Sequence, residues 1–394
     1  MAKTVKRVLF IVSQPFFQWR GSPIRVAFDV QALSQLGYEV HLLVPPFGED
    51  KEYKGVYIHR TRTLPGIRNL PIGPSFPKLL FDCLLYVKAR TLMRMYSFSA
   101  LHGIEDAGAI CALLSRRHNI KFVFEKHSDP ESYRGGFLKN VLMRMYAAVE
   151  RWMIRRADAI IGTGPKLASY AATVCPEKTT VEIPDIPSSL TESTMEEATR
   201  ARCRFARDEK DLLITYVGSF AVYQGIDLLF SSIPIVCKKD ARARFVIIGG
   251  SREQIAIRRA DMRENGCEDR VCFAGFISPD ALPAVLSGSD ILLSPRIAGA
   301  NTPLKILDYL KAGRPIVATE NGANRQILDE SMAVFGAPDA EHYAEAIGKL
   351  LADESLREKL AAGGSDVIRK KYNFDYFRSE MGKLYDSLAL PPSS

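Results

Sequence analysis

Residues 294–319 read SPRIAGANTPLKILDYLKAGRPIVAT, and this stretch predicts a loop, a helix and a buried strand in succession. It follows the apolar run 290–293, which is typical of a short strand. Pro303 suits the first turn of a helix, where its missing N–H leaves no hydrogen bond unmade, and Gly313 suits the end of that helix. The stretch therefore predicts a strand–helix–strand unit, which is typical of a parallel α/β sheet.

The beginning of this helix has the properties of an anion-binding site. Free backbone N–H groups and the positive end of the helix dipole point in the same direction there. Arg296 and Lys305 add positive charge nearby, and Asp308 adds a carboxylate that can accept two hydroxyl hydrogen bonds. These groups together suit a nucleoside diphosphate, because its phosphates would meet the cations and its ribose would meet the carboxylate.

Each of these three residues also has an ordinary explanation. Lys305 and Asp308 are residue types that solvate an exposed helix face, and Arg296 suits a salt bridge within a loop. Both interpretations stay open at the level of the sequence.

The composition is that of an ordinary globular protein, with 394 residues of which 47% are apolar and 25% are charged. This length suits two domains. The seven cysteines are scattered and lack any close metal-ligand pairing, which favours a reducing, cytoplasmic compartment. The apolar run 8–12 is too short for a signal sequence, so we expect a first strand there.

Short apolar runs alternate with helical patterns along both halves of the chain. In the first half the runs are 8–12, 40–44, 122–124 and 159–161; in the second they are 213–217, 245–248, 271–273, 291–293 and 316–318. Mostly apolar strands separated by helices predict parallel sheets with helices on both faces. The sequence thus predicts an α/β fold class with two Rossmann-like domains, joined within the Pro-, Ser- and charge-rich stretch 184–208.

The positive charge lies entirely in the first half. Residues 1–186 hold 26 Lys and Arg against 16 Asp and Glu, whereas residues 187–394 hold 27 against 29. Two predicted helices at 77–98 and 137–156 combine basic with apolar and aromatic residues. They suit docking on an anionic membrane surface, or else they are core helices with solvated basic faces. Nucleic acid is not expected as a partner, because no recognition motif accompanies the charge.

The motifs SPR…NTPLK and YVGSF…YQG, the latter within residues 216–225, resemble the donor-binding core of family 4 glycosyltransferases, in a variant branch of that family. The resemblance extends along most of the chain. It implies the GT-B fold, in which two Rossmann-like domains face a central cleft, and sugar transfer with retention. It also implies an acceptor-binding domain at 1–186, a domain that binds the nucleotide sugar at 187–372, and a final helix at 373–394 that crosses back to the first domain.

The resemblance assigns roles to individual residues. For the donor it implies Gly218, Ser219, Gln224, Gly225, Asn301, Thr302, Pro303, Leu304 and Asp308. For the acceptor it implies the loop and helix start after the first strand, with Gly21, Ser22 and Arg25. His127 resembles the histidine that lies near the reacting sugar, so we expect His127, Arg296 and Lys305 in the catalytic centre. The alternatives are a hydrogen-bonded loop histidine at 127 and ordinary turn chemistry around Gly21.

Three positions depart from the common pattern of the family. Ser219 and Gln224 stand where an arginine and a lysine usually neutralise the diphosphate, and Ala300 stands where a glutamate usually touches the donor sugar. Either the site has decayed or it belongs to a branch that binds the diphosphate with Arg296, Lys305 and backbone N–H groups. We favour the second explanation, because the variant motifs resemble a branch in their own right.

Several motifs of other enzyme classes are missing from the sequence. Leu167 occupies the third glycine position of a dinucleotide fingerprint after the strand 159–161, and no phosphate-binding loop, HExxH or Asp-X-Asp motif occurs. We therefore expect no cofactor and no metal. Retaining transfer in this fold is usually described as same-face attack in which the leaving diphosphate takes the acceptor proton, so no carboxylate nucleophile is required.

The resemblance and the residues together predict a glycosyltransferase that moves a sugar from a nucleotide diphosphate sugar to a lipid-linked or polysaccharide acceptor. We expect it in the cytoplasm, with peripheral attachment to the inner membrane face. The alternative from another class is a non-catalytic GT-B scaffold that binds sugar or membrane. A nucleotide-sugar epimerase of the same fold is a weaker alternative, because the helix at 303–313 resembles the transferases more.

Overall fold

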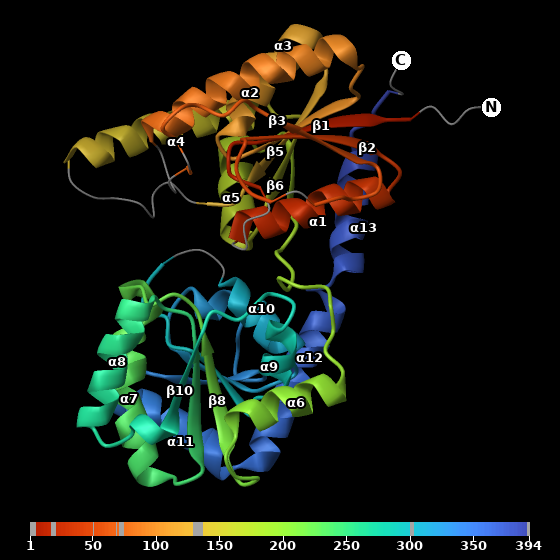
Figure 1. Cartoon of the computed structure of the whole chain (residues 1–394). Helices are drawn as coiled ribbons and strands as arrows, with labels where there is room; N and C mark the ends of the chain where they lie inside the picture. The colour runs from red at the N-terminus through yellow and green to blue at the C-terminus, as the bar shows by residue number, and fades with distance from the viewer. Residues whose placement is uncertain are drawn as a thin grey trace. The chain divides into compact units, whose positions relative to one another are not determined.

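The computed structural model of this protein describes residues 5–16, 21–49, 51–67, 69–70, 75–128, 137–299 and 303–391. The chain divides into two compact units. Unit 1 comprises Met1–Ile186 together with Phe374–Ser394, and unit 2 comprises Pro187–Asn373. Each unit has its own parallel sheet (Figure 1) and its own hydrophobic cores.

Unit 1 is built on a seven-stranded parallel sheet with the order β3-β2-β1-β4-β5-β6-β7. The strands are β1 (Arg7–Val12), β2 (Glu39–Val44), β3 (Val56–Arg60), β4 (Ala100–Ile104), β5 (Lys121–Lys126), β6 (Ala159–Gly162) and β7 (Thr179–Glu182). The order reverses direction at β1, where β1 pairs with both β2 and β4. The carboxyl ends of strands beside such a reversal are where open α/β sheets bind their ligands.

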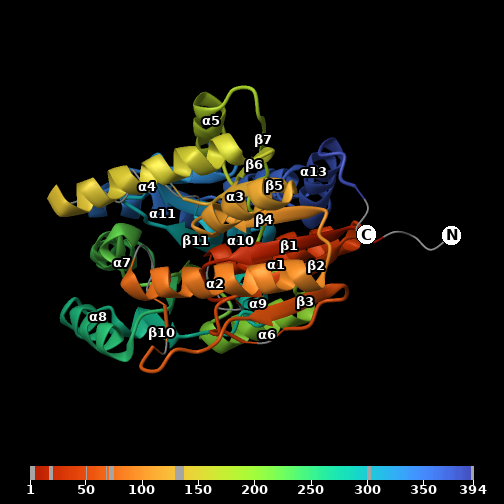
Figure 2. The same ribbon diagram turned by 90° about the horizontal axis from the view of Figure 1, so that it is seen from above.

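Helices cover both faces of this sheet. They are α1 (Gly21–Gln35), α2 (Phe76–Met95), α3 (Ala107–His118), α4 (Phe137–Arg156), α5 (Pro165–Val174) and α13 (Phe374–Ser387). Alternate residues of β1 face opposite cores: Phe10 packs with α1 and α13, whereas Leu9 packs with α2, α3, α4 and α5. Figures 1 and 2 show α2, α3 and α4 on the same side of the sheet.

Unit 2 has a six-stranded parallel sheet with the order β10-β9-β8-β11-β12-β13. Its strands are β8 (Leu212–Val217), β9 (Ala243–Ile248), β10 (Val271–Gly275), β11 (Ile291–Ser294), β12 (Ile316–Thr319) and β13 (Ala333–Gly336). Its α-helices are α6 (Met195–Phe205), α7 (Ile226–Lys239), α8 (Arg252–Glu264), α9 (Leu282–Ser287), α10 (Leu304–Lys311), α11 (Ala340–Ala352) and α12 (Glu354–Lys370). Residues of α7, α8 and α11 pack in one core, and residues of α9 and α10 pack in the other.

The stretch 294–319 forms the predicted strand–helix–strand unit. Helix α10 begins at Leu304, and Pro303 is its N-cap residue with an extended backbone. Pro303 therefore lies one position before the first helical turn, whereas the sequence predicted it within that turn. Gly313 adopts a left-handed φ of 64° just after the helix, as a helix-ending glycine does. The fold class that the sequence predicts, two Rossmann-like α/β domains, is confirmed.

The predicted linker stretch 184–208 contains the boundary between the units after Ile186 but is not all linker. It includes α6, which begins with a capping box in which Thr194 and Glu197 satisfy each other's backbone N–H groups. The sequence of this helix is mostly polar and charged and shows no apolar run, so only its Thr-x-x-Glu signature indicated a helix start.

Within the part of the chain that the structure describes, no helix combines the length and apolar character needed to cross a membrane.

Candidate functional site

Two cations lie near the start of α10 in unit 2. Arg296 follows β11, and Lys305 is in the first turn of the helix. The Lys305 ammonium lies 4.5 Å from the centre of the Tyr216 ring and donates a hydrogen bond to Gln224 Oε1 at 3.1 Å. The Arg296 guanidinium lies 5.5 Å from the centre of the Tyr223 ring, and its Nε donates to the carbonyl of Ala298 at 2.8 Å.

No carboxylate pairs with either cation among the residues that the structure describes. Burial lowers the pKa of Lys305 to about 7, and the nearby charge of Arg296 acts in the same direction. Burial also lowers the pKa of Arg296, which is only 7% exposed. Partly desolvated cations without a counter-ion favour an incoming anion, because an anion removes the electrostatic penalty that burial imposes. The solvated-lysine and salt-bridge alternatives therefore do not describe Lys305 and Arg296.

The loop after β8 brings the YQG motif against the SPR motif. Ile297 donates its backbone N–H to the carbonyl of Tyr223 at 3.1 Å. Gly225 has a φ of 71°, and a side chain on it would overlap the carbonyl oxygen of Pro295. Glycine is therefore required at position 225 by both its backbone conformation and the close approach of the two loops.

The predicted donor residues Gly218 and Ser219 lie beside the same cations. A side-chain carbon on Gly218 would lie 3.6 Å from Lys305 Nζ and 2.7 Å from the hydroxyl oxygen of Tyr216. The Tyr216 hydroxyl donates to the carbonyl of Ser219 at 2.9 Å, which fixes this turn. The structure thus gathers Gly218, Ser219, Gln224, Gly225, Arg296, Pro303, Leu304 and Lys305 around the start of α10. The predicted residues Asn301 and Thr302, together with Ala300, lie outside the described residues.

Asp308 has a different environment from the one that the sequence suggested. Its Oδ1 accepts the backbone N–H of Ser188 at 2.6 Å, and its Oδ2 accepts the Ser188 hydroxyl at 2.8 Å. Burial raises the pKa of Asp308 to about 6, although the hydrogen bonds from Ser188 oppose that rise. Asp308 is therefore a partly buried, hydrogen-bonded carboxylate and not a solvated group on an exposed helix face.

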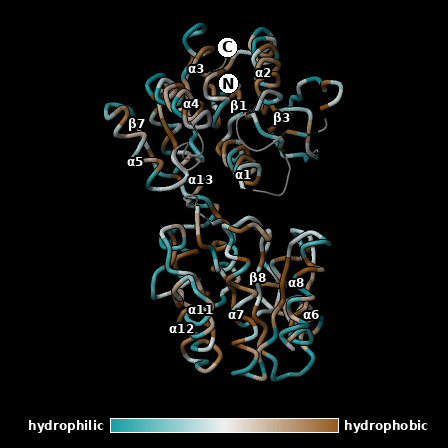
Figure 3. Tube along the Cα trace, turned by 90° about the vertical axis from the view of Figure 1, so that its left-hand side faces the viewer, coloured by the Kyte–Doolittle hydropathy of each residue, from teal (hydrophilic) through white to brown (hydrophobic). Residues whose placement is uncertain are grey.

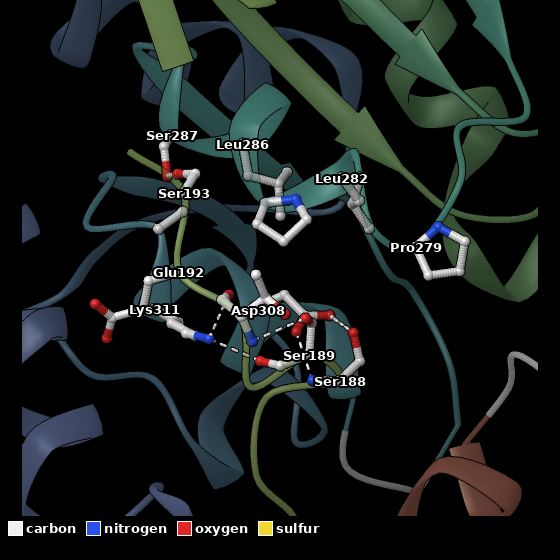
Figure 4. A pocket seen from close by; sticks show the side chains of 13 residues that line it. Ser188, Ser189, Glu192, Ser193, Pro279, Leu282, Leu286, Ser287, Asp308 and Lys311 are labelled. Atoms are coloured by element: carbon white, nitrogen blue, oxygen red, sulfur yellow. Dashed lines mark hydrogen bonds between the residues drawn. The ribbon is translucent and has the colours of Figure 1, made fainter. Parts of the chain in front are cut away.

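Asp308 lines a cavity of about 290 Å³ in unit 2 (Figure 4). One wall is polar, with Ser188, Asp308 and Lys311, whose ammonium donates to the carbonyl of Ser189 at 2.7 Å. The other wall is apolar; it is formed by Pro279, Leu282, Pro283, Leu286 and Ala312. An apolar wall opposite a few fixed polar groups is typical of small-molecule pockets. Nothing in the sequence indicated Ser188, because a serine in a Pro- and Ser-rich stretch is typical of a loop.

In unit 1, the predicted residues His127 and Ser22 meet at the carboxyl end of β5. His127 Nδ1 and the Ser22 hydroxyl are 3.0 Å apart, and His127 Nε2 is 2.8 Å from Glu125 Oε1. Gly21, the first residue of α1, is exposed next to Ser22. The ionised Glu125 accepts the Nε2 proton of His127 and so fixes the orientation of the imidazole.

Burial lowers the pKa of His127, but the hydrogen bond to Glu125 and the charges of Glu125 and Glu105 outweigh it, so the net shift is upward. The imidazolium form is therefore stabilised. His127 is a hydrogen-bonded loop histidine, as the alternative interpretation stated, and it also lies at the sheet edge where ligands of α/β folds bind.

The prediction that Arg25 contacts an acceptor is wrong. Arg25 is 3% exposed and donates to Glu125 at 2.9 Å and to the carbonyl of Ile183 at 2.8 Å. Its guanidinium lies 4.5 Å from the centre of the Phe377 ring. Because position 25 is on the buried side of α1, this cation balances buried carboxylates inside unit 1 and cannot reach a ligand at the surface.

Asp29, Glu125 and His127 place potential metal-ligand atoms within 4.8 Å of one another. Arg25 Nε lies 3.3 Å from Asp29 and 2.9 Å from Glu125, so a guanidinium already neutralises these carboxylates. A divalent cation would be repelled by Arg25 at this position. The cluster therefore does not fit a metal, and the sequence-based expectation of no metal stays a prediction.

Two family models match the chain, one within each unit. The model described as Glycosyltransferase Family 4 matches residues 28–183, and the model described as Glycosyl transferases group 1 matches residues 211–353. The first covers most of the unit 1 sheet, and the second covers β8 to β13 with the start of α10. The resemblance to glycosyltransferases stated from the motifs is thereby supported in both units.

Two sequence relatives and one solved structure show how far the likeness extends. The chain is 26% identical over 198 residues to α-D-kanosaminyltransferase of Streptomyces kanamyceticus, covering 49% of this chain and 50% of that protein, so it spans about half the length of that relative. It is 25% identical over 362 residues to a phosphatidylinositol N-acetylglucosaminyltransferase subunit of Arabidopsis thaliana, covering 89% and 76%. The structure of sucrose-phosphate synthase from Thermosynechococcus elongatus aligns with a TM-score of 0.77 at 20% identity, covering 98% and 99% of the two chains, which shows the shared fold.

Proposed function

We propose that this protein, a glycosyltransferase of the GT-B fold by its family matches and its architecture, moves a sugar from a nucleotide diphosphate sugar to a lipid-linked or polysaccharide acceptor, with retention of configuration. In this proposal unit 2 binds the donor and unit 1 binds the acceptor.

The pair of cations at the start of α10 is the observation that carries the proposal. Lys305 and Arg296 are partly or fully buried and have no acidic partner among the described residues. The positive end of α10 adds about half an elementary charge in the same place. A diphosphate supplies the negative charge that this site lacks.

The cavity beside Asp308 suits the nucleoside part of the donor. Its volume of about 290 Å³ and its apolar wall around Leu282 and Leu286 accommodate a planar base. Asp308 offers two acceptor oxygens for the ribose hydroxyls once Ser188 releases them. In this arrangement the base, ribose and diphosphate would follow α10 from Asp308 back to its first turn.

His127 has the properties of a group that positions the reacting sugar. Its imidazolium form is stabilised, so it can donate to a sugar hydroxyl or to a phosphate oxygen. Its partner Glu125 is held ionised by Arg25 and is fully buried, so it is not placed to attack the sugar. This supports transfer in which the leaving diphosphate accepts the acceptor proton, and we propose that the reaction uses neither a metal nor a cofactor.

The acceptor is proposed to lie in or at an anionic membrane surface, with the protein in the cytoplasm at the inner face. The exposed large apolar side chains of α2 and α4 include Leu79, Val87 and Met95, and Leu142, Met145 and Val149. Basic residues stand among them. Figure 3 shows both hydrophilic and hydrophobic segments around α2 and α4. Lys78 is not part of this surface, since it is buried and pairs with Asp106. Mixed apolar and basic helix faces suit the interface of an anionic leaflet.

Calorimetric titration tests the proposal. Full-length protein is titrated, without divalent metal, with UDP-glucose, GDP-mannose, ADP-glucose and TDP-glucose. Binding of one donor, followed by release of its nucleoside diphosphate when membrane extract is added, is expected. The absence of binding by all four would contradict the donor assignment and favour a non-catalytic scaffold.

The scaffold alternative rests on the departures from the family pattern at Ser219, Gln224 and Ala300. Ser219 and Gln224 are neutral where the family pattern has two cations, and Gln224 accepts a hydrogen bond from Lys305, so one of the cations that remain is partly engaged within the protein. A protein that binds a donor but never releases its nucleoside diphosphate in the presence of acceptor extract would fit this alternative.

A further inference from the structure

Glu105 has an unusual backbone for its residue type. It directly follows β4 and has a φ of 50°, which lies in the left-handed region that side chains with a Cβ atom avoid. Among the described non-glycine residues, only Asn119 and Ala389 share a positive φ, and Asn119 is the C-cap of α3, where asparagine commonly adopts it. No such ordinary reason applies to a glutamate between a strand and a helix.

Among the residues that the structure describes, the side chain of Glu105 makes four hydrogen bonds, three of them with the segment that follows β5. Its Oε1 accepts the backbone N–H of His127 at 2.5 Å and that of Ser128 at 2.6 Å. Its Oε2 lies 3.2 Å from the Ser128 hydroxyl and 3.3 Å from the Tyr146 hydroxyl of α4, and both hydroxyls donate. Glu105 is 5% exposed, so these bonds form away from solvent.

The hydrogen bonds of the Glu105 side chain explain why its strained backbone conformation is maintained. Charge-assisted hydrogen bonds to two consecutive backbone N–H groups are strong and fix the direction in which a chain leaves a strand. Backbone strain of this kind persists where surrounding contacts over-determine it, and it concentrates at functional sites. Strands β4 and β5 pair directly, so their carboxyl ends are neighbours. The left-handed turn at Glu105, just after β4, therefore directs its carboxylate toward the loop that follows β5.

We propose that Glu105 is a positioning residue for the transfer reaction, because it holds the backbone of His127 and Ser128 so that the His127 imidazole faces the reacting sugar. The backbone is held by Glu105 and the ring by Glu125, so two carboxylates with separate tasks orient one histidine. This inference rests on the proposed function of His127, but the contacts that carry it do not depend on which sugar is transferred.

Two substitutions separate positioning from a merely structural role. Glu105→Gly removes the carboxylate and relieves the positive φ, so the protein stays folded while the loop loses its anchor. Glu105→Gln keeps an oxygen that can accept both N–H groups and serves as the conservative variant. Ile257→Ala, on the exposed surface of α8, is the control, because Ile257 belongs to neither the proposed transfer site nor the proposed membrane surface.

Two measurements are made on the full-length protein. The first is kcat and KM for release of nucleoside diphosphate from whichever of the four donors binds. Glu105→Gly is expected to lower kcat by about tenfold to a hundredfold with KM changed less than about threefold, as a small misplacement of a reacting group does. Glu105→Gln is expected to retain kcat within about threefold.

The second measurement is hydrogen–deuterium exchange of the His127 and Ser128 amides, which does not require turnover. Glu105→Gly is expected to speed exchange at these two amides by at least about tenfold, with the amides of β5 unchanged. Equal kcat in Glu105→Gly and wild type, or equal exchange at the two amides, would overturn the inference. A wild-type protein that turns over no donor would contradict the proposed function instead, and the exchange result would still decide the role of Glu105.

Discussion

Ser188 donates both its backbone N–H and its hydroxyl to the two oxygens of Asp308, at 2.6 and 2.8 Å. These are the two acceptor positions that a ribose with two hydroxyl groups would use. Ser188, just after the boundary of the units, and the ribose of the proposed nucleotide therefore compete for the same two oxygens of Asp308. Nucleotide binding must displace Ser188 from these oxygens.

Ser188→Ala is expected to tighten nucleotide binding. The substitution removes one of the two competing donors and leaves the backbone N–H, so we expect the Kd for the preferred nucleoside diphosphate to fall by a factor of about three to ten, the equivalent of one ordinary hydrogen bond. Calorimetry measures the change. Ser189→Ala is the control, because Ser189 lines the same cavity without contacting Asp308. Weaker binding by Ser188→Ala would contradict a competition at Asp308.

Lys305→Met is expected to weaken the binding of nucleoside diphosphate by about tenfold to a hundredfold, since a hydrogen bond to a charged group contributes roughly 1.5–3 kcal/mol. Methionine keeps most of the side-chain volume beside Tyr216 and removes only the charge. The same substitution at Lys239, in the last turn of α7, is the control and should leave the Kd unchanged. If both variants bind as wild type does, the diphosphate does not lie at the start of α10.

Nucleotide affinity is expected to be highest between about pH 6 and pH 7. Burial raises the pKa of Asp308 to about 6, so the carboxylate loses its acceptor capacity as the pH falls below that value. Burial lowers the pKa of Lys305 to about 7, so its positive charge is lost as the pH rises above that value in the free protein.

Titrations from pH 5 to pH 9 in buffers with different ionisation enthalpies measure this dependence. Above pH 7, binding should take up a proton, because the diphosphate favours the charged form of Lys305. Lys305→Met should lose this proton uptake. An affinity that stays constant from pH 7 to pH 9 would mean that Lys305 does not contact the phosphates.

Arg25→Met is expected to destabilise the protein by about 3–5 kcal/mol, because it leaves Glu125 as a buried carboxylate without its main counter-ion. Thermal or urea unfolding measures this loss. Arg378→Met removes an exposed pair with Asp375 and should cost less than about 1 kcal/mol. A loss for Arg25→Met as small as that of Arg378→Met would contradict a structural role for the buried guanidinium.

Neutralising basic residues of α4 is expected to weaken membrane binding. Replacing Arg144, Arg151 and Arg155 by glutamine should reduce binding to vesicles that contain anionic phosphatidylglycerol by about 1 kcal/mol for each charge that faces the surface. Replacing Arg200, Arg204 and Arg207 in and after α6 is the matched control. Vesicle sedimentation measures both triple variants, and an equal loss in the two would indicate a general charge effect without a docking surface.

The sequence predicted the fold from strong local signals. These signals are the apolar runs, the proline before α10 and the glycine after it, and each depends on chemistry within a few residues. The bounds of β11, α10 and β12 therefore agree closely with those predicted from the stretch 294–319. The residues around the start of α10 were also identified, since the resemblance placed them along contiguous motifs.

The sequence could not show partners that come from distant segments. Ser188 and Asp308 are 120 positions apart, and Arg25 meets Glu125 and Ile183 across 100 and 158 positions. An arginine just inside a helix next to a candidate binding loop is equally consistent with a ligand contact and with a buried ion pair. These two roles are distinguished only by knowing which side of α1 faces the core. The amphipathic pattern of this helix is too weak to show that side in the sequence.

Helix α13 belongs to unit 1 although it follows unit 2 in the chain. Tyr385 reaches His102 on β4 at 2.9 Å, and Phe377 lies over Arg25, so the last helix covers the ion network behind His127. During synthesis, residues 187–373 are contiguous and can fold as soon as they emerge, whereas unit 1 lacks a wall of its core until residue 387 is made. The half that begins first is therefore finished last, because the wall that α13 contributes to its core is made only after residues 187–373.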